Sequence, residues 1–151
     1  MRNWGRQRDD LQRRLDRVAS RLGDRVRGKV VEAEAIVALL ESVIEPGDRV
    51  CLEGNNQKQA DFLARALVQV DPARLTGLPM VQSVLALPEH LDLFDKGIAS
   101  RVDFSFSGPQ ASRLAQLIAD RRITIGAIHT YLELFARYFI DLTPRVALVA
   151  A

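Results

Sequence analysis

Apolar positions follow two spacings along most of the chain. Short apolar runs predict buried strands, and the stretches between them, with an apolar residue every three to four positions, predict amphipathic helices. The predicted strands span residues 49–52, 80–87, 102–106, 123–128 and 146–149. Strands that alternate with helices form parallel sheets through right-handed crossovers. We therefore expect an α/β fold, with a mainly parallel five-stranded sheet and helices on both faces.

Cap and turn residues predict where the helices between these strands begin. After the first strand, Asn55 or Asn56 can act as an N-cap for a helix whose inner face includes Phe62. Pro88 marks the start of the second helix, and the Ser107-Gly108-Pro109 turn opens the third. Each strand and the helix after it then form one βα unit.

The last helix and the last strand raise a separate expectation. Thr130 and Glu133 have the spacing of a capping box, and the helix that they begin is apolar on most sides, which predicts that it is deeply covered. Residues 146–151 resemble a central strand. Because parallel strands need covered faces and paired edges, we expect more protein, in cis or in trans, beside this strand.

The start of the chain differs from the rest in charge. Residues 1–29 hold nine Arg, one Lys and four Asp, a net charge of +6, whereas the remaining residues carry −4. A narrow apolar stripe runs through this basic segment at helical spacing: Leu11, Leu15, Val18 and Leu22. A second helix is expected over residues 31–44. We divide the chain into a basic helical segment, residues 1–29, and an α/β domain, residues 30–151.

Composition narrows the possible functions. A chain of 151 residues with 48% hydrophobic and 26% charged residues suits one globular domain and excludes disorder. One Cys and two His leave too few ligands for a multi-Cys or His-based metal site, so no metal is expected. No apolar run approaches the roughly 18 residues of a membrane span, and no signal peptide is evident, which predicts a cytoplasmic protein. Interspersed Asp residues argue against nucleic acid as the partner of the basic helix and favour docking on protein.

Ligands of α/β sheets bind beyond the carboxyl ends of the strands, so the loops there hold the candidate sites. The first loop offers a glycine, amide side chains and a lysine for an anionic or carbonyl-bearing ligand: Gly54, Asn55, Asn56, Gln57 and Lys58. Glu53 precedes them and could serve as an acid or a nucleophile. The alternatives are a plain capped turn for the loop and an N-cap or an ion pair with Lys58 for Glu53.

Five further residues have a functional and a structural interpretation, or a structural one alone. Ser107 and Gly108 could form an accessory loop, although Gly-Pro at a helix start is also a common structural feature. His129 could act as an acid, a base or a hydrogen-bond donor, or could simply be satisfied by a neighbouring helix cap. Cys51 is interpreted as a small buried apolar residue. His90, beside acidic residues, is expected to be solvated.

Long blocks of sequence carry a resemblance to a known family. The blocks are GDRVCLEG (47–54), NQKQADFLA (56–64), MVQSVLALPEH (80–90), DFSF (103–106) and GAIHTYLELF (126–135). They are similar to the alpha subunit of bacterial biotin-independent malonate decarboxylase, an acyl-carrier-protein transferase related to the CoA-transferases. The resemblance implies a CoA-transferase-like, Rossmann-like fold. It also implies that the phosphopantetheine-type thiol arm of the carrier protein moves from acetate to malonate.

The same resemblance sets expectations for the site and the partners. Residues 54–58 become the loop that faces the substrate or the thiol arm. The catalytic carboxylate is expected in a second half of the family's chain, so this chain is expected to be an N-terminal portion that is inactive alone. The partners implied are malonate or acetate, the carrier protein and the decarboxylase subunits, and no covalently bound cofactor is implied. The alternatives are a stand-alone module for a phosphate-bearing or CoA-like ligand and a non-catalytic assembly domain.

Overall fold

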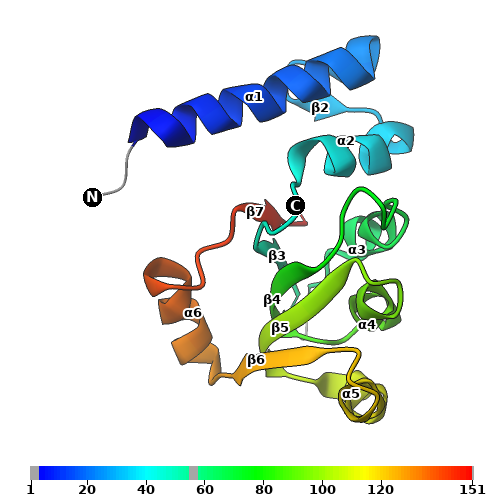
Figure 1. The fold of residues 1–151 in the computed structure, drawn as a ribbon, viewed down its shortest axis with the longest axis vertical. Helices are drawn as coiled ribbons and strands as arrows, with labels where there is room; N and C mark the ends of the chain where they lie inside the picture. Colours follow the sequence, from blue (N-terminus) through cyan, green and yellow to red (C-terminus); the bar gives the residue numbers. More distant parts are fainter. Residues whose placement is uncertain (1–3, 55–57, 151) are drawn as a thin grey trace.

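A five-stranded parallel sheet forms the centre of the molecule. The computed structural model describes residues 4–54 and 58–150, and the sheet has the strand order β6-β5-β4-β3-β7 (Figure 1). The strands are β3 (Val50–Leu52), β4 (Leu78–Val84), β5 (Ala99–Phe106), β6 (Thr124–Ile128) and β7 (Val146–Leu148). The predicted α/β fold is confirmed, and each strand begins and ends within three residues of its predicted bounds.

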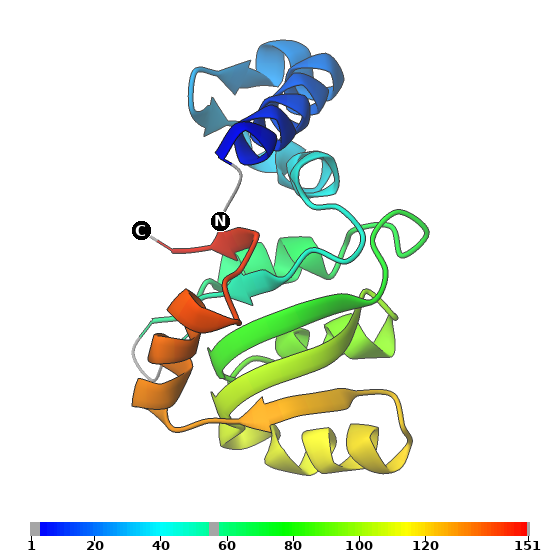
Figure 2. The same cartoon turned by 60° about the vertical axis from the view of Figure 1, so that its left-hand side comes forward.

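The two faces of the sheet are covered unequally. Three helices pack on one face: α3 (Asp61–Leu67), α4 (Pro88–Asp95) and α5 (Ala111–Ala119). A single helix, α6 (Tyr131–Ile140), lies against the other (Figures 1 and 2). Because side chains alternate along a strand, Met80 of β4 enters the large core under the three helices, whereas Val81 enters a small core under α6.

The N-terminal elements lie beyond the β7 edge of the sheet (Figures 1 and 2). Helix α1 (Trp4–Leu22) packs on α2 (Ile36–Val43), and a short hairpin connects them: β1 (Val26–Arg27) and β2 (Val30–Val31). The expected helix over residues 31–44 therefore starts later, at Ile36, after the 3-10 turns η1 (Gly23–Arg25) and η2 (Ala33–Ala35). The hairpin forms because Gly28 adopts a positive φ of 64° in its two-residue turn. The division at residue 29 stays a prediction.

The buried side of α1 is not the predicted apolar stripe. Val18 and Leu22 are buried against α2, but Leu11 and Leu15 are half exposed. Arg14 lies one turn before Val18 and is buried in place of Leu11 and Leu15. The helix is rotated in this way because the Arg14 guanidinium forms ion pairs with several carboxylates on that side. A pattern of hydrophobic residues does not predict the stabilisation that these ion pairs provide.

Three other expectations about the elements need correction. Helix α3 begins at Asp61 with Ala60 at its N-cap, so neither Asn55 nor Asn56, which lie outside the described residues, caps it. Phe62, expected on the inner face, is 47% exposed because α3 has only seven residues and turns its alanines and Leu67 inward. Helix α6 is not deeply covered, since most of its large apolar side chains are exposed in the described structure.

Strand β7 also differs from its expected place. It pairs with β3 alone among the described residues and lies at the edge of the sheet, where a central strand had been expected. That more protein lies beside it stays a prediction.

Candidate functional site

A cavity of about 230 Å³ opens beyond the carboxyl ends of β3 and β4, where α6 and the end of β7 approach them. Its lining combines one carboxylate, one thiol and three hydroxyl side chains with apolar walls: Cys51, Leu52, Glu53, Gly54, Ser83, Tyr131, Tyr138 and Val149. This is the position at which α/β sheets bind their ligands. The cavity is therefore the candidate functional site.

Among the described residues that line this cavity, Glu53 is the only one with a carboxylate. Its Oε2 accepts a hydrogen bond of 2.7 Å from the Ala150 backbone N–H and lies 3.6 Å from Lys58 Nζ. The backbone N–H of Glu53 donates to the carbonyl of Leu148 at 2.9 Å. The ion pair with Lys58 that was one reading of Glu53 is thus present, while the carboxylate still faces the cavity. These contacts hold the carboxylate in place at the junction of β3 and β7.

The predicted loop after β3 closes tightly at its base. The Ala60 N–H donates to the Glu53 carbonyl at 3.1 Å, and Gly54 and Gln59 form an antiparallel bridge. A Cβ atom on Gly54 would lie only 2.4 Å from Gln59 Oε1, so a glycine allows this close approach. Gly54 lines the cavity, and Lys58 forms an ion pair with Glu53, which also lines it. The other predicted loop residues, Asn55, Asn56 and Gln57, lie outside the described residues.

Cys51 and Tyr138 form the inner wall of the cavity, between the sheet and α6. The Cys51 thiol donates a weak hydrogen bond to the Tyr138 hydroxyl, with 3.6 Å between Sγ and Oη. Burial raises the pKa of the Cys51 thiol, and the nearby Glu53 raises it further. Burial also raises the pKa of Tyr138, with Ser83 as a hydrogen-bonding neighbour. Both groups stay neutral at pH 7, so Cys51 is a poor nucleophile here. The burial expected for Cys51 is only partial, because the residue lines the cavity.

His129 is placed at the end of β6, apart from the cavity. It is buried between the sheet and α6, with Nε2 3.6 Å from Asp103 Oδ1 and Nδ1 3.4 Å from Glu133 Oε1. Arg101 Nε donates to the other oxygen of Asp103 at 3.3 Å. Gly126 on β6 makes room for this carboxylate, because a Cβ there would lie 2.3 Å from it. Glu133, in the first turn of α6, is thus close to His129, but the buried Nε2 has no hydrogen-bond partner among the described residues. The expectation that a neighbouring helix cap satisfies this imidazole is therefore not met.

Ser107 and Gly108 also lie away from the cavity, at the end of β5. Gly108 starts the 3-10 turn η3 (Gly108–Gln110) that leads into α5, and its φ is +52°. A Cβ on Gly108 would touch Val84 at 3.4 Å, so the residue has a packing role beside β4. The structure therefore brings Glu53, Gly54 and Lys58 together, and leaves Ser107, Gly108 and His129 on neighbouring strand ends.

The expectation that His90 is solvated is wrong. The residue is fully buried, and its Nδ1 accepts a long hydrogen bond of 3.5 Å from the Leu87 N–H. The first turn of α4 faces the core, which places this imidazole against the end of β4 and leaves the neighbouring Glu89 at the surface side. Burial lowers the pKa of His90 to about 4, so its imidazole is neutral at pH 7.

Sequence reasoning missed the hydroxyl groups of the cavity. Ser83 lies on the α6 side of β4, and Tyr131 and Tyr138 lie seven residues apart on α6, a spacing that places both on one side of a helix. That spacing was a usable signal, because a buried tyrosine needs a partner for its hydroxyl. Neither hydroxyl was among the site residues predicted from the sequence.

Two further features bear on what the site can hold. Within residues 4–54 and 58–150, no three His, Cys, Asp or Glu side chains are grouped to bind a metal ion. In the same part of the chain, no helix has the length and the apolar character needed to cross a membrane. The chemistry that the cavity itself offers is a fixed carboxylate and neutral hydroxyl donors, which suit a small acyl group or carboxylic acid.

Comparison with known proteins agrees with this architecture. The family model described as "malonate decarboxylase, alpha subunit, transporter" matches residues 3–151. The acetyl-S-ACP:malonate ACP transferase of Malonomonas rubra is 52% identical over 148 residues, which cover 98% of this chain and 26% of the relative.

Solved structures give the same result. The crystal structure of a Pseudomonas malonate decarboxylase hetero-tetramer in complex with malonate matches with a TM-score of 0.90 and 54% identity, over 97% of this chain and 26% of that one. The malonate decarboxylase alpha subunit of Acinetobacter baumannii matches with a TM-score of 0.90 and 48% identity, over 95% and 26%. The chain thus spans about a quarter of the length of these relatives. With a family match over nearly its whole length, the chain belongs to the malonate decarboxylase alpha subunit family.

Proposed function

We propose that this chain is the N-terminal part of an acyl-carrier-protein transferase subunit of malonate decarboxylase. The observation that carries the proposal is its 52% identity, over 98% of its length, to a protein named for the transfer from acetyl-S-ACP to malonate. The cavity at the strand ends supports it, because its polar groups suit a small carboxylic acid or its thioester.

The proposed reaction exchanges one thioester for another. The C–S bond between the acetyl group and the carrier thiol breaks, and a C–S bond forms between that thiol and a carboxyl carbon of malonate. One oxygen of that malonate carboxylate leaves with the acetyl group as acetate, so the atoms balance without a redox partner. The thiol arm belongs to the carrier protein, and the chain itself needs no covalently bound cofactor for this exchange.

The residues of the cavity and its loop divide into two roles in this proposal. The loop of residues 54–58 faces the substrate or the thiol arm, and Ser83 and the tyrosine hydroxyls offer hydrogen bonds to a carbonyl oxygen. Glu53 keeps the loop closed through its carbonyl and positions Lys58 through its carboxylate. A volume of about 230 Å³ suits an acyl group with the end of the arm. Ser107, Gly108 and His129 remain accessory candidates on the neighbouring strand ends.

The proposal assigns turnover to the assembled subunit. Since the chain spans 26% of the Malonomonas relative, we place the catalytic carboxylate in the other three quarters and expect this chain alone to be inactive. The proposed partners are the carrier protein and the decarboxylase subunits. Support comes from the Pseudomonas relative, which occurs in a hetero-tetramer in complex with malonate.

An acyl-exchange assay tests this function. The chain is joined to the part of the Malonomonas transferase outside the match and incubated with acetyl-carrier protein and malonate, and mass spectrometry follows malonyl-carrier formation. We expect exchange by the joined protein and none by the 151-residue chain alone. Glu53→Gln and Ser83→Ala should each lower kcat/KM about tenfold, which corresponds to one lost transition-state contact. Glu34→Gln, at an exposed carboxylate remote from the cavity, is the matched control.

Two results would contradict the proposal. The absence of exchange by the joined protein, under conditions in which the intact Malonomonas transferase is active, would refute the assigned reaction. Wild-type kcat/KM in both cavity variants would remove the cavity from the mechanism while leaving the reaction in place.

A further inference from the structure

Helix α6 carries a cluster of exposed apolar side chains, of which the proposed reaction uses only the hydroxyl of Tyr131. Of the 13 large apolar side chains exposed among the described residues, five belong to this helix. We call them the α6 outer face: Tyr131, Leu132, Phe135, Phe139 and Ile140. Each is between 59% and 80% exposed. The cluster is far too dense for the scattered apolar residues of an ordinary surface.

The arrangement of residues around α6 explains this face. Leu134 and Tyr138 point to the sheet, and the charged residues occupy a single ridge: Glu133, Arg137 and the C-cap Asp141. The remaining two ridges are apolar, and no other described residue covers them. The helix therefore has the composition of one buried on three sides, while the sheet covers only one side.

The α6 outer face is large and already ordered. Five aromatic and aliphatic side chains at these exposures present on the order of 500 Å² of surface, which is near the upper limit for a monomer. Phe135 and Phe139 pack edge to face, with ring centroids 5.6 Å apart. Ile128, just before the helix, is 68% exposed and extends the apolar surface. Burial of such a surface against a protein partner would favour binding.

The charges at its border indicate what kind of partner fits. Arg137 and Asp141 pair with each other on the charged ridge, and the carboxylate of Glu133 lies next to His129. The border therefore carries little net charge that could attract a strongly acidic or basic partner. The face therefore fits an apolar protein surface.

The fold also places a specific polypeptide near α6. The relatives that match are about four times as long as this chain. In the proposed N-terminal position, the rest of the subunit follows β7, and β7 lies beside α6: Ala147 pairs with Cys51, whose Sγ is 3.6 Å from Tyr138 Oη. A segment attached there has an effective concentration on the order of millimolar at the α6 outer face.

We infer that the α6 outer face binds the part of the malonate decarboxylase alpha subunit that its relatives carry outside the matched quarter. The face binds that part whether it continues this chain or is supplied as a separate polypeptide. The inference rests on the proposed N-terminal position in the subunit and does not depend on the proposed reaction, because it concerns binding alone. Docking on α6 would also press Tyr131 and Tyr138 against the cavity that they line.

Co-expression tests this inference. The chain carries an affinity tag, and the untagged partner is the Malonomonas transferase without its matched quarter. We expect a 1:1 complex after tag purification, confirmed by analytical ultracentrifugation. Phe135→Asp/Phe139→Asp should reduce capture at least tenfold. The matched control is Leu11→Asp/Leu15→Asp, two half-exposed apolar residues at the same spacing on α1, which lies on the other side of β7 from α6 (Figures 1 and 2).

The controls make each result decisive. Thermal unfolding by circular dichroism checks that both double variants fold, which is expected because the replaced side chains are at least half exposed. Capture that is absent with the wild-type chain, or undiminished by the Phe135/Phe139 change, would overturn the inference. An equal loss from the Leu11/Leu15 change would do the same by showing nonspecific association. A homodimer of this chain that the Phe135/Phe139 change dissociates would assign the face to a second copy instead.

Discussion

At the scale of single residues, two polar side chains are buried although the sequence around them predicts that they are exposed. His90 stands between Glu89 and Leu91, in a segment that has the composition of a solvated helix start, yet it is fully buried. Arg14 lies in a run of charged residues and is 6% exposed. Arg13 and Leu15, the neighbours of Arg14, are exposed, whereas His90 stands between the partly buried Glu89 and the buried Leu91. In both cases only the packing of other elements determines that the polar side chain is inside.

The burial of His90 predicts a dependence of stability on pH. Its pKa is about 4 in the folded chain and about 6.5 when unfolded, so the unfolded state takes up the proton first. The stability that neutral His90 contributes is complete above about pH 6.5 and is lost as the pH falls toward 4. Between pH 7 and pH 5 this loss is about 2 kcal/mol.

Urea unfolding at both pH values checks this prediction. His90→Gln has no group that titrates in this range, so the wild type should lose about 2 kcal/mol more stability than the variant on acidification. The other titrating groups are common to both proteins and cancel in the comparison. Equal losses in wild type and variant would show that His90 is protonated without unfolding.

At the scale of elements, α6 has the apolar composition of a buried helix, but only its sheet-facing side is packed. Its contacts with the sheet form a small core of Val81, Leu134, Leu142 and the partly buried Tyr138. The start of the helix is held by Thr130, whose Oγ1 accepts a hydrogen bond of 3.2 Å from the Glu133 N–H. An element with one covered side depends more on its cap than a deeply packed helix does.

Removal of this cap should loosen α6 locally. Thr130→Ala leaves the Glu133 N–H without its acceptor and should cost about 1 kcal/mol. Hydrogen exchange followed by NMR should then show the α6 amides exchanging about fivefold faster, with the β4 and β5 amides unchanged. Thr130→Ser keeps the hydroxyl and should exchange like the wild type. A uniform acceleration across the sheet would contradict a local role for the cap.

At the scale of the whole molecule, ion pairs fasten the N-terminal layer to the sheet. Arg14 Nη2 donates to Glu45 at 2.9 Å and Nη1 donates to the Val43 carbonyl at 2.7 Å. Arg14 also pairs with Asp48, just before β3, and this partner holds the pKa of the guanidinium above its usual value. Asp10 completes the network by joining Arg14 to Arg145, which precedes β7. One buried guanidinium thus links α1, α2 and the sheet.

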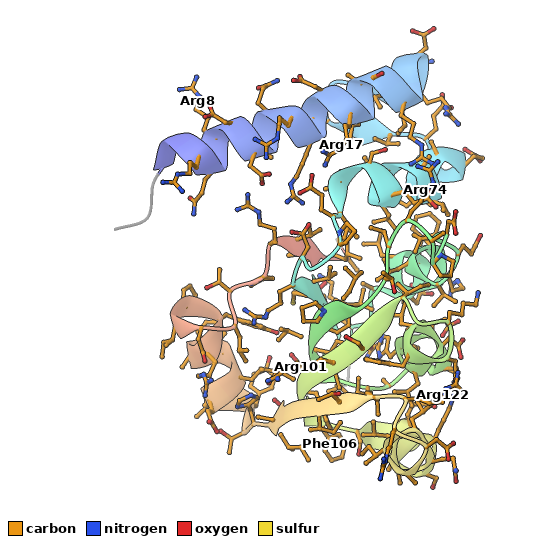
Figure 3. All side chains as sticks on the ribbon, in the orientation of Figure 1. Arg8, Arg17, Arg74, Arg101, Phe106 and Arg122 are labelled. Atoms are coloured by element: carbon orange, nitrogen blue, oxygen red, sulfur yellow. The ribbon has the colours of Figure 1, made fainter. Side chains whose placement is uncertain are left out.

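Loss of this guanidinium should weaken the attachment of α1 to α2 and the sheet. Arg14→Ala leaves the partly buried carboxylate of Asp48 without its ion-pair partner and removes one of the partners of Asp10, which should lower the free energy of unfolding by about 3 kcal/mol. Arg8→Ala is the control, because Arg8 is exposed on the side of α1 away from α2 (Figure 3) and should change stability by less than about 0.5 kcal/mol. Urea unfolding compares the two. A similar effect of both changes would show that α1 adds stability only through its general charge.

The sequence by itself determined the order of strands and helices, the parallel sheet and the loop after β3, because hydrophobic spacing and cap residues act over a few positions. It also predicted Glu53, Gly54 and Lys58 as a local group. Only the tertiary structure decided that Ser83 and Tyr138 join that group from β4 and α6, and that His90 and Arg14 are buried. These outcomes depend on contacts between residues far apart in the chain. The composition of α6 showed that most of its surface belongs in an interior, whereas the fold decided which side the sheet covers and which it leaves exposed.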